Sequence, residues 1–284
     1  MSHVAIAQET VSIVERGGYE LPSGARVDVR HAVARALSGT RLYAPADFAT
    51  LALPAPAHEG PPAIEVTGET TAEAARRLVE REGVPRVAAL NFASARNPGG
   101  GFLRGARAQE EDLARCSALY ACQLLHRPYY DANRESASLL YTDHLIYSPE
   151  VPFFRNESLA LLPAPFLVSI LTSPAPNAGE ARARGESSAA IRAALERRAE
   201  QVLRVAAHHA HPTLVLGAWG CGVFQNDPVA VAAVFAELLE GPRLAGRFAR
   251  VVFAVFDRSK GQLNRGAFEK QFGRSRDALG RPTG

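Results

Sequence analysis

Beyond residue 63, the chain alternates short apolar segments with longer stretches of helical periodicity, and this alternation limits the fold more than any other feature. The apolar segments predict strands at Ile64–Thr67, Val87–Phe92, Leu145–Ser148, Phe166–Leu171, Thr213–Leu216 and Val251–Phe256. The periodic stretches predict helices at Thr71–Glu82, Gln109–Leu125, Ser188–His209 and Val229–Glu240. Strands that alternate with helices are typical of an α/β fold with a layered sheet. Ligands bind such sheets beyond the carboxyl ends of the strands, so we expect a site in the loops after Phe92, Leu171, Leu216 and Phe256.

The first 62 residues show a different pattern. Apolar residues recur at helical spacing over Ile6–Val14, before Gly17 and Gly18, and two short strands at Tyr19–Leu21 and Arg26–Val29 flank a Pro-Ser-Gly turn. A proline-rich stretch at residues 53–62 predicts a loop or linker. We therefore expect an N-terminal α+β extension (residues 1–62) packed on a core domain (residues 63–272), followed by a flexible C-terminal tail (residues 273–284).

The composition allows one large folded domain and excludes several functions. The chain has 284 residues, 47% of them hydrophobic, and a formal charge of +3. Only Lys260 and Lys270 are lysines, so 30 of the 32 basic residues are arginines. We interpret this excess mostly as compositional bias, because acidic residues nearly cancel it and the arginines at positions 192, 197, 198 and 204 resemble a solvated helix face. Binding to nucleic acid is therefore not favoured.

Cysteine use and the N-terminus bear on the compartment. The three cysteines lack C-x-x-C spacing, which argues against a disulfide framework and a structural zinc site and fits a reducing cytoplasm. The N-terminus has no signal-peptide pattern, and no apolar run is long enough to span a membrane. A cytoplasmic location is expected.

A glycine-rich loop follows the strand at Val87–Phe92. It contains Gly99, Gly100 and Gly101, and seven residues later a predicted helix opens with Gln109, Glu110 and Glu111. Acids in a first turn often only complement the helix dipole. Glycines directly after a buried strand, with carboxyl groups close behind, instead indicate a pocket with backbone donors and a proton-transferring group. A phosphate loop is excluded, because no Lys-Ser or Lys-Thr pair follows and G-x-G-x-x-G is absent.

The loop after Leu216 holds Gly220, Cys221, Gly222, Val223 and Phe224, and it precedes a helix that we expect to start with Asp227 as its cap and Pro228 as its first residue. These glycines allow either a tight turn or amides directed toward an anion, and both interpretations can hold. Cys221 is not favoured as a nucleophile, because no His or Asp partner arrangement is recognisable.

The spacing of the three glycines and the Gln-Glu-Glu triplet resembles the signature of poly(ADP-ribose) glycohydrolases, and Leu90–Ala95 with Asn97-Pro98 resembles the bacterial-type branch of that family. The resemblance extends from about Ala5 to Phe256. It implies a three-layer α/β/α macrodomain-like sandwich with a mixed central sheet, which hydrolyses ribose–ribose O-glycosidic bonds without a metal or other cofactor. The implied partners are poly(ADP-ribose), ADP-ribose and poly(ADP-ribosyl)ated proteins, with no nucleic acid and no membrane, and a monomer is expected.

The resemblance also implies roles for individual residues. Glu111 would be the general acid and base, Glu110 and Asn97 would hold ribose hydroxyls, and Gln109 would orient the loop. The amides of the glycine-rich loop would accommodate the sugar. Residues Gly220 to Val223 would wrap the diphosphate, Phe224 would pack on the ribose nearest the scissile bond, and Phe256 would stack on adenine.

Two alternatives stay open. A non-catalytic ADP-ribose reader would share the fold and the glycine loops, although it has no reason to place the Gln-Glu-Glu triplet beside the ribose. An arginine-driven nucleic-acid binder would show steeply salt-dependent binding to DNA. The histidines at 208, 209 and 211 are interpreted as charged caps at a helix end rather than as metal ligands. Residues 173–177 are expected to form a wall of the cleft.

Overall fold

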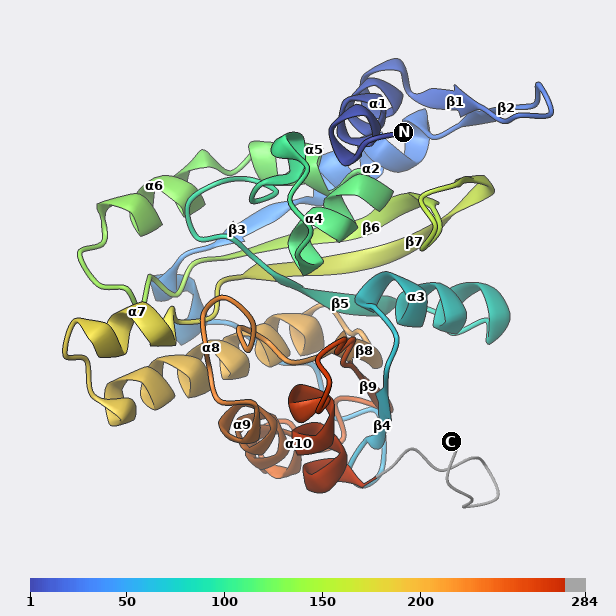
Figure 1. The fold of residues 1–284 in the computed structure, drawn as a ribbon. Coiled ribbons are helices and arrows are strands. Elements are labelled where there is room, and N and C mark those ends of the chain that lie inside the picture. The colour runs from blue at the N-terminus through green and yellow to red at the C-terminus, as the bar shows by residue number, and fades with distance from the viewer. Residues whose placement is uncertain (274–284) are drawn as a thin grey trace.

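The computed structural model describes residues 1–273, which form two helical layers around a mixed sheet (Figure 1). The predicted tail is residues 273–284, and all of it beyond Gly273 lies outside the described residues. Seven strands in the order β3-β6-β7-β5-β8-β9-β4 make the sheet. Their bounds are β3 Arg41–Tyr43, β4 Ala63–Thr67, β5 Val87–Phe92, β6 Leu145–Arg155, β7 Leu161–Ser173, β8 Thr213–Leu216 and β9 Arg250–Ala254. The predicted α/β/α sandwich with a mixed sheet is confirmed.

Five strands, β7, β5, β8, β9 and β4, run parallel to one another, while β6 pairs antiparallel with β7 and β3 pairs antiparallel with β6. Strand β5 shows why these segments form a central sheet. Val87 and Ala89 pack into one apolar core, and Ala88 and Leu90 pack into the other. Because the pleat alternates side chains and both faces are covered by helices, a continuous apolar run is what such a strand requires.

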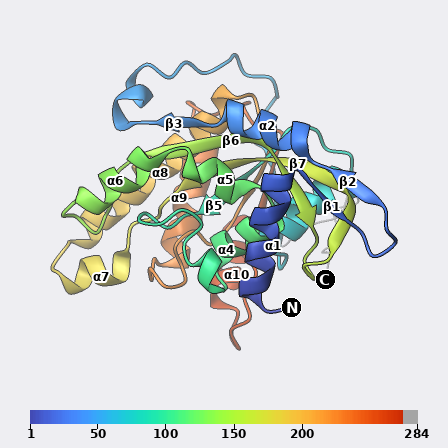
Figure 2. The same cartoon turned by 90° about the horizontal axis from the view of Figure 1, so that it is seen from above.

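Helices cover both faces. One face carries α8 (Ser188–His208), α9 (Pro228–Glu240) and α10 (Leu263–Phe272), whose apolar side chains share a core with β8 and β9. The other face carries the first five helices, as the view from above also shows (Figures 1 and 2). These are α1 His3–Arg16, α2 Arg30–Gly39, α3 Thr71–Arg76 with a π turn at Arg77–Arg81, α4 Gln109–Cys116 and α5 Leu119–Leu124. The remaining helical elements are α6 Arg127–Glu135, α7 Ala178–Ala183 and 3₁₀ turns at Pro45–Ala49 and Phe102–Arg104.

The N-terminal extension is attached to both the sheet and the helices. A two-stranded hairpin, β1 (Gly18–Glu20) with β2 (Arg26–Asp28), follows α1 as predicted, and residues 53–62 form an irregular connection. The hydroxyl of Thr10 donates to the carbonyl of Arg115 at 2.8 Å, which ties α1 to α4. Strand β3 completes one edge of the main sheet. Division of the chain at residue 62 therefore stays a prediction.

Several predicted boundaries were wrong. The helix expected over Gln109–Leu125 is broken into α4 and α5, because Ser117 bridges to Phe153 and the amide of Ala118 donates to the carbonyl of Pro152. Strands β6 and β7 are longer than expected, and α2, α6, α7, α10 and β3 were not predicted. No helix among the described residues is long and apolar enough to cross a membrane.

Candidate active site

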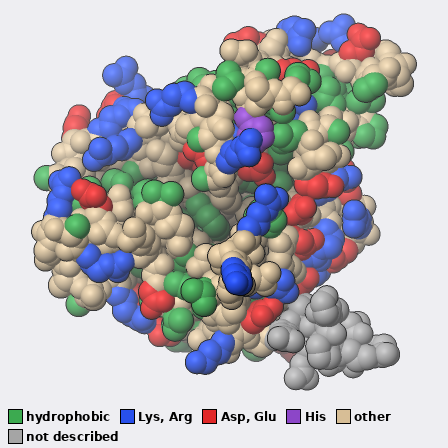
Figure 3. Space-filling model, viewed as in Figure 1, with side chains coloured by type: hydrophobic (Ala, Val, Ile, Leu, Met, Phe, Trp, Pro, Cys, Tyr) green, Lys and Arg blue, Asp and Glu red, His purple; other side chains and the backbone are tan. Residues whose placement is uncertain are grey.

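Three loops gather at the carboxyl ends of β5, β7 and β8, where the sequence predicts a site. They are residues 93–108, 174–177 and 217–227. The carbonyl of Ser173 accepts from the amide of Ala93 and from the indole of Trp219, both at 3.2 Å, so one atom joins the three loops. The surface is hollowed near the centre of this face (Figure 3).

Gln109 fixes the start of α4 against β5. Its side-chain oxygen accepts from the amide of Phe92 at 2.8 Å, and its side-chain nitrogen donates to the carbonyl of Leu90 at 2.8 Å and to the hydroxyl of Thr71 at 3.0 Å. These bonds satisfy backbone groups at the carboxyl end of β5, so they hold the first turn of α4 against that end of the strand. The orienting role predicted for Gln109 has this geometric support.

The carboxyl group of Glu110 is buried, with only 3% of the residue exposed. Oε1 accepts from Gln123 at 2.7 Å and from Asn91 at 3.2 Å, and Oε2 accepts from the amide of Ser94 at 2.7 Å. Burial raises the pKa of Glu110 to about 8, and the adjacent charge of Glu111 raises it too, although the three donors favour the ionised form. Glu110 is therefore mostly protonated at neutral pH.

Glu111 lies against the glycine loop. Its Oε1 accepts from the amide of Gly101 at 2.7 Å, and its Oε2 accepts from the amide of Ala108 at 2.9 Å. A Cβ atom on Gly100 would overlap Oε1 of Glu111 and would lie 3.0 Å from Oε2 of Glu110. Gly100 also has φ +57°, so glycine is required there both for the backbone and for the approach of two carboxyl groups.

The neighbouring loop residues shape the same wall. Gly99 has φ +62° and packs beside Tyr120, and the carbonyl of Asn97 accepts from the amide of Gly100 at 3.0 Å. The amide of Asn97 donates to the hydroxyl of Ser94, and its side chain is exposed. The structure thus brings the three predicted glycines and both glutamates together, with Asn97 on the rim.

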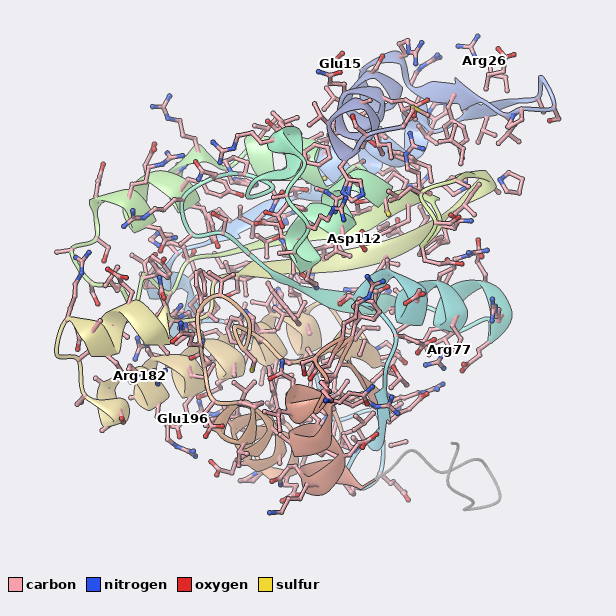
Figure 4. The ribbon with its side chains drawn as sticks, in the orientation of Figure 1. Glu15, Arg26, Arg77, Asp112, Arg182 and Glu196 are labelled. Atoms are coloured by element: carbon pink, nitrogen blue, oxygen red, sulfur yellow. The ribbon has the colours of Figure 1, made fainter. Side chains whose placement is uncertain are left out.

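The loop 217–227 is clasped by a buried asparagine. Asn226 donates from its side chain to the carbonyl of Pro176 at 2.8 Å and from its amide to the carbonyl of Gly220 at 3.0 Å. Gly220 has φ +73°, and a Cβ there would overlap both Asn226 and Ala175. Arg182 on α7 donates to the carbonyl of Gln225 at 2.7 Å, which fastens the far end of the loop (Figure 4).

In the turn from Gly220 to Phe224, four of the five amides have no hydrogen-bond acceptor within residues 1–273: those of Gly220, Gly222, Val223 and Phe224. Unpaired amides close together in one turn form a concave site for an anion. Cys221 differs, because its amide donates to the carbonyl of Ala218 at 3.1 Å, and burial raises the pKa of its thiol to about 12. A thiol with so high a pKa is a poor nucleophile at neutral pH. As predicted, Asp227 caps α9 and Pro228 is its first residue.

The two predicted aromatic contacts lie in different surroundings. Phe224 packs on Tyr141, with ring centroids 5.9 Å apart. Phe256 lies beyond the end of β9 and is about half exposed, and the guanidinium of Arg258 sits 4.7 Å above its ring. Both residues therefore keep some accessible surface.

The interpretation of the histidines as charged helix caps was wrong for two of them. His209 stacks on Tyr147 and bonds to the hydroxyl of Tyr43 at 2.7 Å, and His211 bonds to the hydroxyl of Tyr147 at 2.8 Å. Burial lowers the pKa of both imidazoles to about 4, so they are neutral at pH 7. In the described part of the chain, no three His, Cys, Asp or Glu side chains are placed to hold a metal ion.

Sequence reasoning missed the residues that hold the site from behind. Asn91, Ser94 and Gln123 position Glu110, and Asn226 shapes the second loop. One signal was present: Asn91 is a polar residue inside the apolar run of β5, and such a residue needs a buried partner. Gln123 offered no comparable signal, because a glutamine on a helix is ordinary.

Known proteins similar to this chain identify its enzyme class. Residues 7–156 match the family model described as "Microbial-type PARG, catalytic domain", which makes the chain a hydrolase of the macrodomain-like class. Poly(ADP-ribose) glycohydrolase from Thermomonospora curvata is 52% identical, with a TM-score of 0.89 over 95% of this chain and 99% of that one. Its complex with the inhibitor ADP-HPD gives 52% and 0.87 over the same shares.

A second bacterial enzyme agrees. Poly(ADP-ribose) glycohydrolase from Deinococcus radiodurans, solved with ADP-ribose, is 50% identical with a TM-score of 0.78, over 86% of this chain and 98% of that one. No curated protein matches the chain. The chain therefore belongs to the microbial-type poly(ADP-ribose) glycohydrolase family. The glycohydrolase predicted from the sequence is thus confirmed in preference to a reader module.

Proposed function

We propose that Glu111 is the general acid and base with which this glycohydrolase cleaves the ribose–ribose O-glycosidic bonds of poly(ADP-ribose). The observation that carries this proposal is the placement of its carboxyl group. Two backbone amides hold Glu111 against Gly100 and Gly101, on the side of the loop where no Cβ intervenes. Of the two adjacent carboxyl groups, Glu111 is also the less buried, at 7% exposed.

The reaction needs a group that donates a proton to the bridging oxygen and later accepts a proton from water. Glu111 protonates the bridging oxygen, the bond from that oxygen to the anomeric carbon breaks, and positive charge develops on the ribose ring. A water molecule then adds to the anomeric carbon, and the glutamate recovers a proton from it. The products are ADP-ribose and a polymer shortened by one unit with a free hydroxyl.

Glu110 supports this exchange in two ways. Because burial raises its pKa to about 8, Glu110 is mostly protonated at neutral pH and adds little negative charge beside Glu111. Its Oε2 accepts a single amide hydrogen bond and faces the open side of Gly100, so it can accept a bond from a ribose hydroxyl. The exposed side chain of Asn97 on the rim supports a second contact to the ribose.

The loop 217–227 supplies the anion site in this proposal. The unpaired amides of Gly220, Gly222, Val223 and Phe224 would receive the diphosphate of ADP-ribose, and the amide of Cys221 stays bonded within the loop. The ring of Phe224 would pack on the ribose nearest the scissile bond and that of Phe256 on adenine. The solved complex of the Deinococcus radiodurans enzyme with ADP-ribose supports this ligand class.

The remaining features of the proposal come from the sequence. The natural substrates would be poly(ADP-ribosyl)ated proteins, and the protein would act as a cytoplasmic monomer with no metal or other cofactor. Residues 1–62 would be an extension on the core, with limited proteolysis within 53–62 as the test of that division. Size-exclusion chromatography tests the monomer.

Replacement of Glu111 by Gln tests the central assignment. Glu111→Gln should lower the rate of ADP-ribose release from poly(ADP-ribose) by about 10³-fold, because general acid–base catalysis by one group is worth roughly 10² to 10⁴. Its Kd for ADP-ribose should stay within about threefold of wild type, since each factor of ten costs about 1.4 kcal/mol and no ligand contact is removed.

The matched control is Asp112→Asn. Asp112, labelled in Figure 4, is the next acid in the same first turn of α4, and its carboxylate lies 3.7 Å from the guanidinium of Arg115. This variant should release ADP-ribose at nearly the wild-type rate. Release by Glu111→Gln at a rate close to that of the control would show that the general acid is another residue.

A further inference from the structure

A pocket that the proposed reaction does not use lies between the glycine loop and α6. Its volume is about 280 Å³, and it is lined by Pro98, Leu124, Arg127, Tyr130 and Arg134. We call these five residues the α6 pocket, since three of them belong to α6. A cavity of this size is at the lower end of the range for small-molecule sites, so it suits part of a nucleotide rather than a whole one.

Two residues of the α6 pocket are close in sequence to residues that contact Glu110 and Glu111. Pro98 is two residues from Gly100, and two residues span at most about 7 Å. Leu124 directly follows Gln123, whose side chain donates to Oε1 of Glu110 at 2.7 Å. The pocket therefore opens within the length of one nucleotide from the proposed reaction centre.

The rim of the pocket is cationic. Arg127 and Arg134 both bond to Asp131, at 3.0 Å and 2.9 Å, so two guanidinium groups share one carboxylate. Their side chains are 85% and 44% exposed. Each guanidinium has five donors, so it can keep its bond to Asp131 and still bind a phosphate. Basic side chains also gather over α6 in the space-filling view (Figure 3).

The rest of the pocket is apolar, with one polar atom that lacks a partner. Leu124 exposes about half of its surface, and Pro98 adds a rigid apolar edge. Tyr130 is only 1% exposed, and its hydroxyl has no hydrogen-bond partner among the described residues. An apolar surface, a buried hydroxyl without a partner and two guanidinium groups together match an adenosine phosphate, with its flat base, ribose hydroxyls and negative charge.

We propose that the α6 pocket binds the adenosine phosphate portion of the polymer unit on the far side of the scissile bond. This inference rests on the proposed function, in which loop 217–227 holds the unit on the near side. The scissile bond joins two ADP-ribose units, so the second unit has to leave the carboxyl pair past the rim of the glycine loop. Pro98 lies on that rim, and the arginines of α6 stand next to it.

The test is the double variant Arg127→Ala with Arg134→Ala, assayed on poly(ADP-ribose) and, for binding, on ADP-ribose. We expect its KM for the polymer to rise about tenfold, the equivalent of about 1.4 kcal/mol. Its Kd for ADP-ribose should equal that of wild type, because a single unit ends before the pocket. The matched control is Arg192→Ala with Arg243→Ala, two exposed, ion-paired arginines on the α8 and α9 side, and its polymer KM should stay at the wild-type value.

A second variant tests polymer binding in the pocket without changing the charge of the protein. Tyr130→Phe removes a hydroxyl that bonds to no described residue, so the fold should lose no stability. We expect it to raise the polymer KM about threefold, and a wild-type KM would remove Tyr130 from the proposal.

The outcomes distinguish a failure of the proposed function from a failure of the α6 pocket as a polymer site. If the wild-type protein releases no ADP-ribose from the polymer, the proposed function fails. If wild type is active but the Arg127 and Arg134 variant has the KM of its control, the α6 pocket is not a polymer site. A tenfold rise in the Kd of the Arg127 and Arg134 variant for ADP-ribose, equal to its rise in polymer KM, would also overturn the assignment. It would show that both arginines bind the unit on the near side of the scissile bond.

Discussion

Gly100→Ala tests whether the carboxyl pair depends on the glycine loop. The added Cβ would overlap Oε1 of Glu111 and would lie 3.0 Å from Oε2 of Glu110. Either Glu111 gives up the amide bond from Gly101, or the loop moves by a few tenths of an ångström or more. In both cases the reacting carboxyl leaves the place where the substrate would meet it.

The effect on stability and the effect on activity should separate. An alanine at φ +57° costs about 1 to 2 kcal/mol, since the left-handed region is strained for every residue with a Cβ. A displacement of about 1 Å in a reacting group can cost 10²-fold in rate. We therefore expect kcat for ADP-ribose release to fall about 10- to 100-fold, while the melting temperature falls only by about 5 °C.

The control isolates the backbone strain. Gly24, in the turn between β1 and β2, has φ +82° and no atom within 4 Å of an added Cβ. Gly24→Ala should show a similar thermal shift by differential scanning fluorimetry and a wild-type kcat on poly(ADP-ribose). If Gly100→Ala keeps kcat within twofold of Gly24→Ala, the contact between Gly100 and Glu111 does not support the reaction.

Two further predictions concern buried charges. Because burial raises the pKa of Glu110 to about 8, the folded protein keeps a proton that the unfolded chain releases near its ordinary value of 4.5. Unfolding free energy from urea titrations should therefore fall by up to about 4 kcal/mol between pH 5 and pH 8, and Glu110→Gln should flatten that slope; an unchanged slope would refute the shift. Arg198→Met should destabilise the fold by about 3 to 5 kcal/mol, because the carbonyls of Pro174 and Leu140 lose their buried donor and Asp143 keeps only Arg197 as a partner. The exposed Arg197→Ala should cost about 1 kcal/mol or less, because Asp143 then keeps the buried Arg198. Equal losses for the two arginine variants would contradict the burial argument.

Two central strands, β5 and β8, could be predicted to the residue because both of their faces are buried. Val87–Phe92 and Thr213–Leu216 are continuous apolar runs, and β5 and β8 have the same bounds. The edge strand β3 could not be predicted, because three residues carry no period and their pairing with β6 is a tertiary choice. The break between α4 and α5 depends on Pro152 and Phe153, which lie more than thirty residues away in the chain.

In the site, too, some features could be predicted from the sequence and others could not. The glycines and glutamates could be found because their spacing carries the chemistry, and Gly100 and Glu111 do lie in contact. The donors that set the surroundings of Glu110 come from β5, the loop after it and α5, so only the folded chain shows that Gln123 and Asn91 meet one carboxyl oxygen. The neutral state of His209 and His211 likewise depends on their burial, which they reach by packing beside tyrosines of β3 and β6.

The arginine excess is partly explained by the loops that arginines hold. Arg198 was interpreted as part of a solvated helix face, which was wrong: it is buried on α8 and donates to the carbonyls of Pro174 and Leu140, beside the cleft. Arg115 is also buried and donates to the carbonyl of Ala106, between Gly101 and Gln109, and Arg182 donates to that of Gln225. A planar guanidinium can bind two carbonyls at once, which a lysine does with far less geometric control. These arginines therefore serve a polyanionic substrate indirectly, by fixing the backbone loops whose amides and carboxyl groups would meet it.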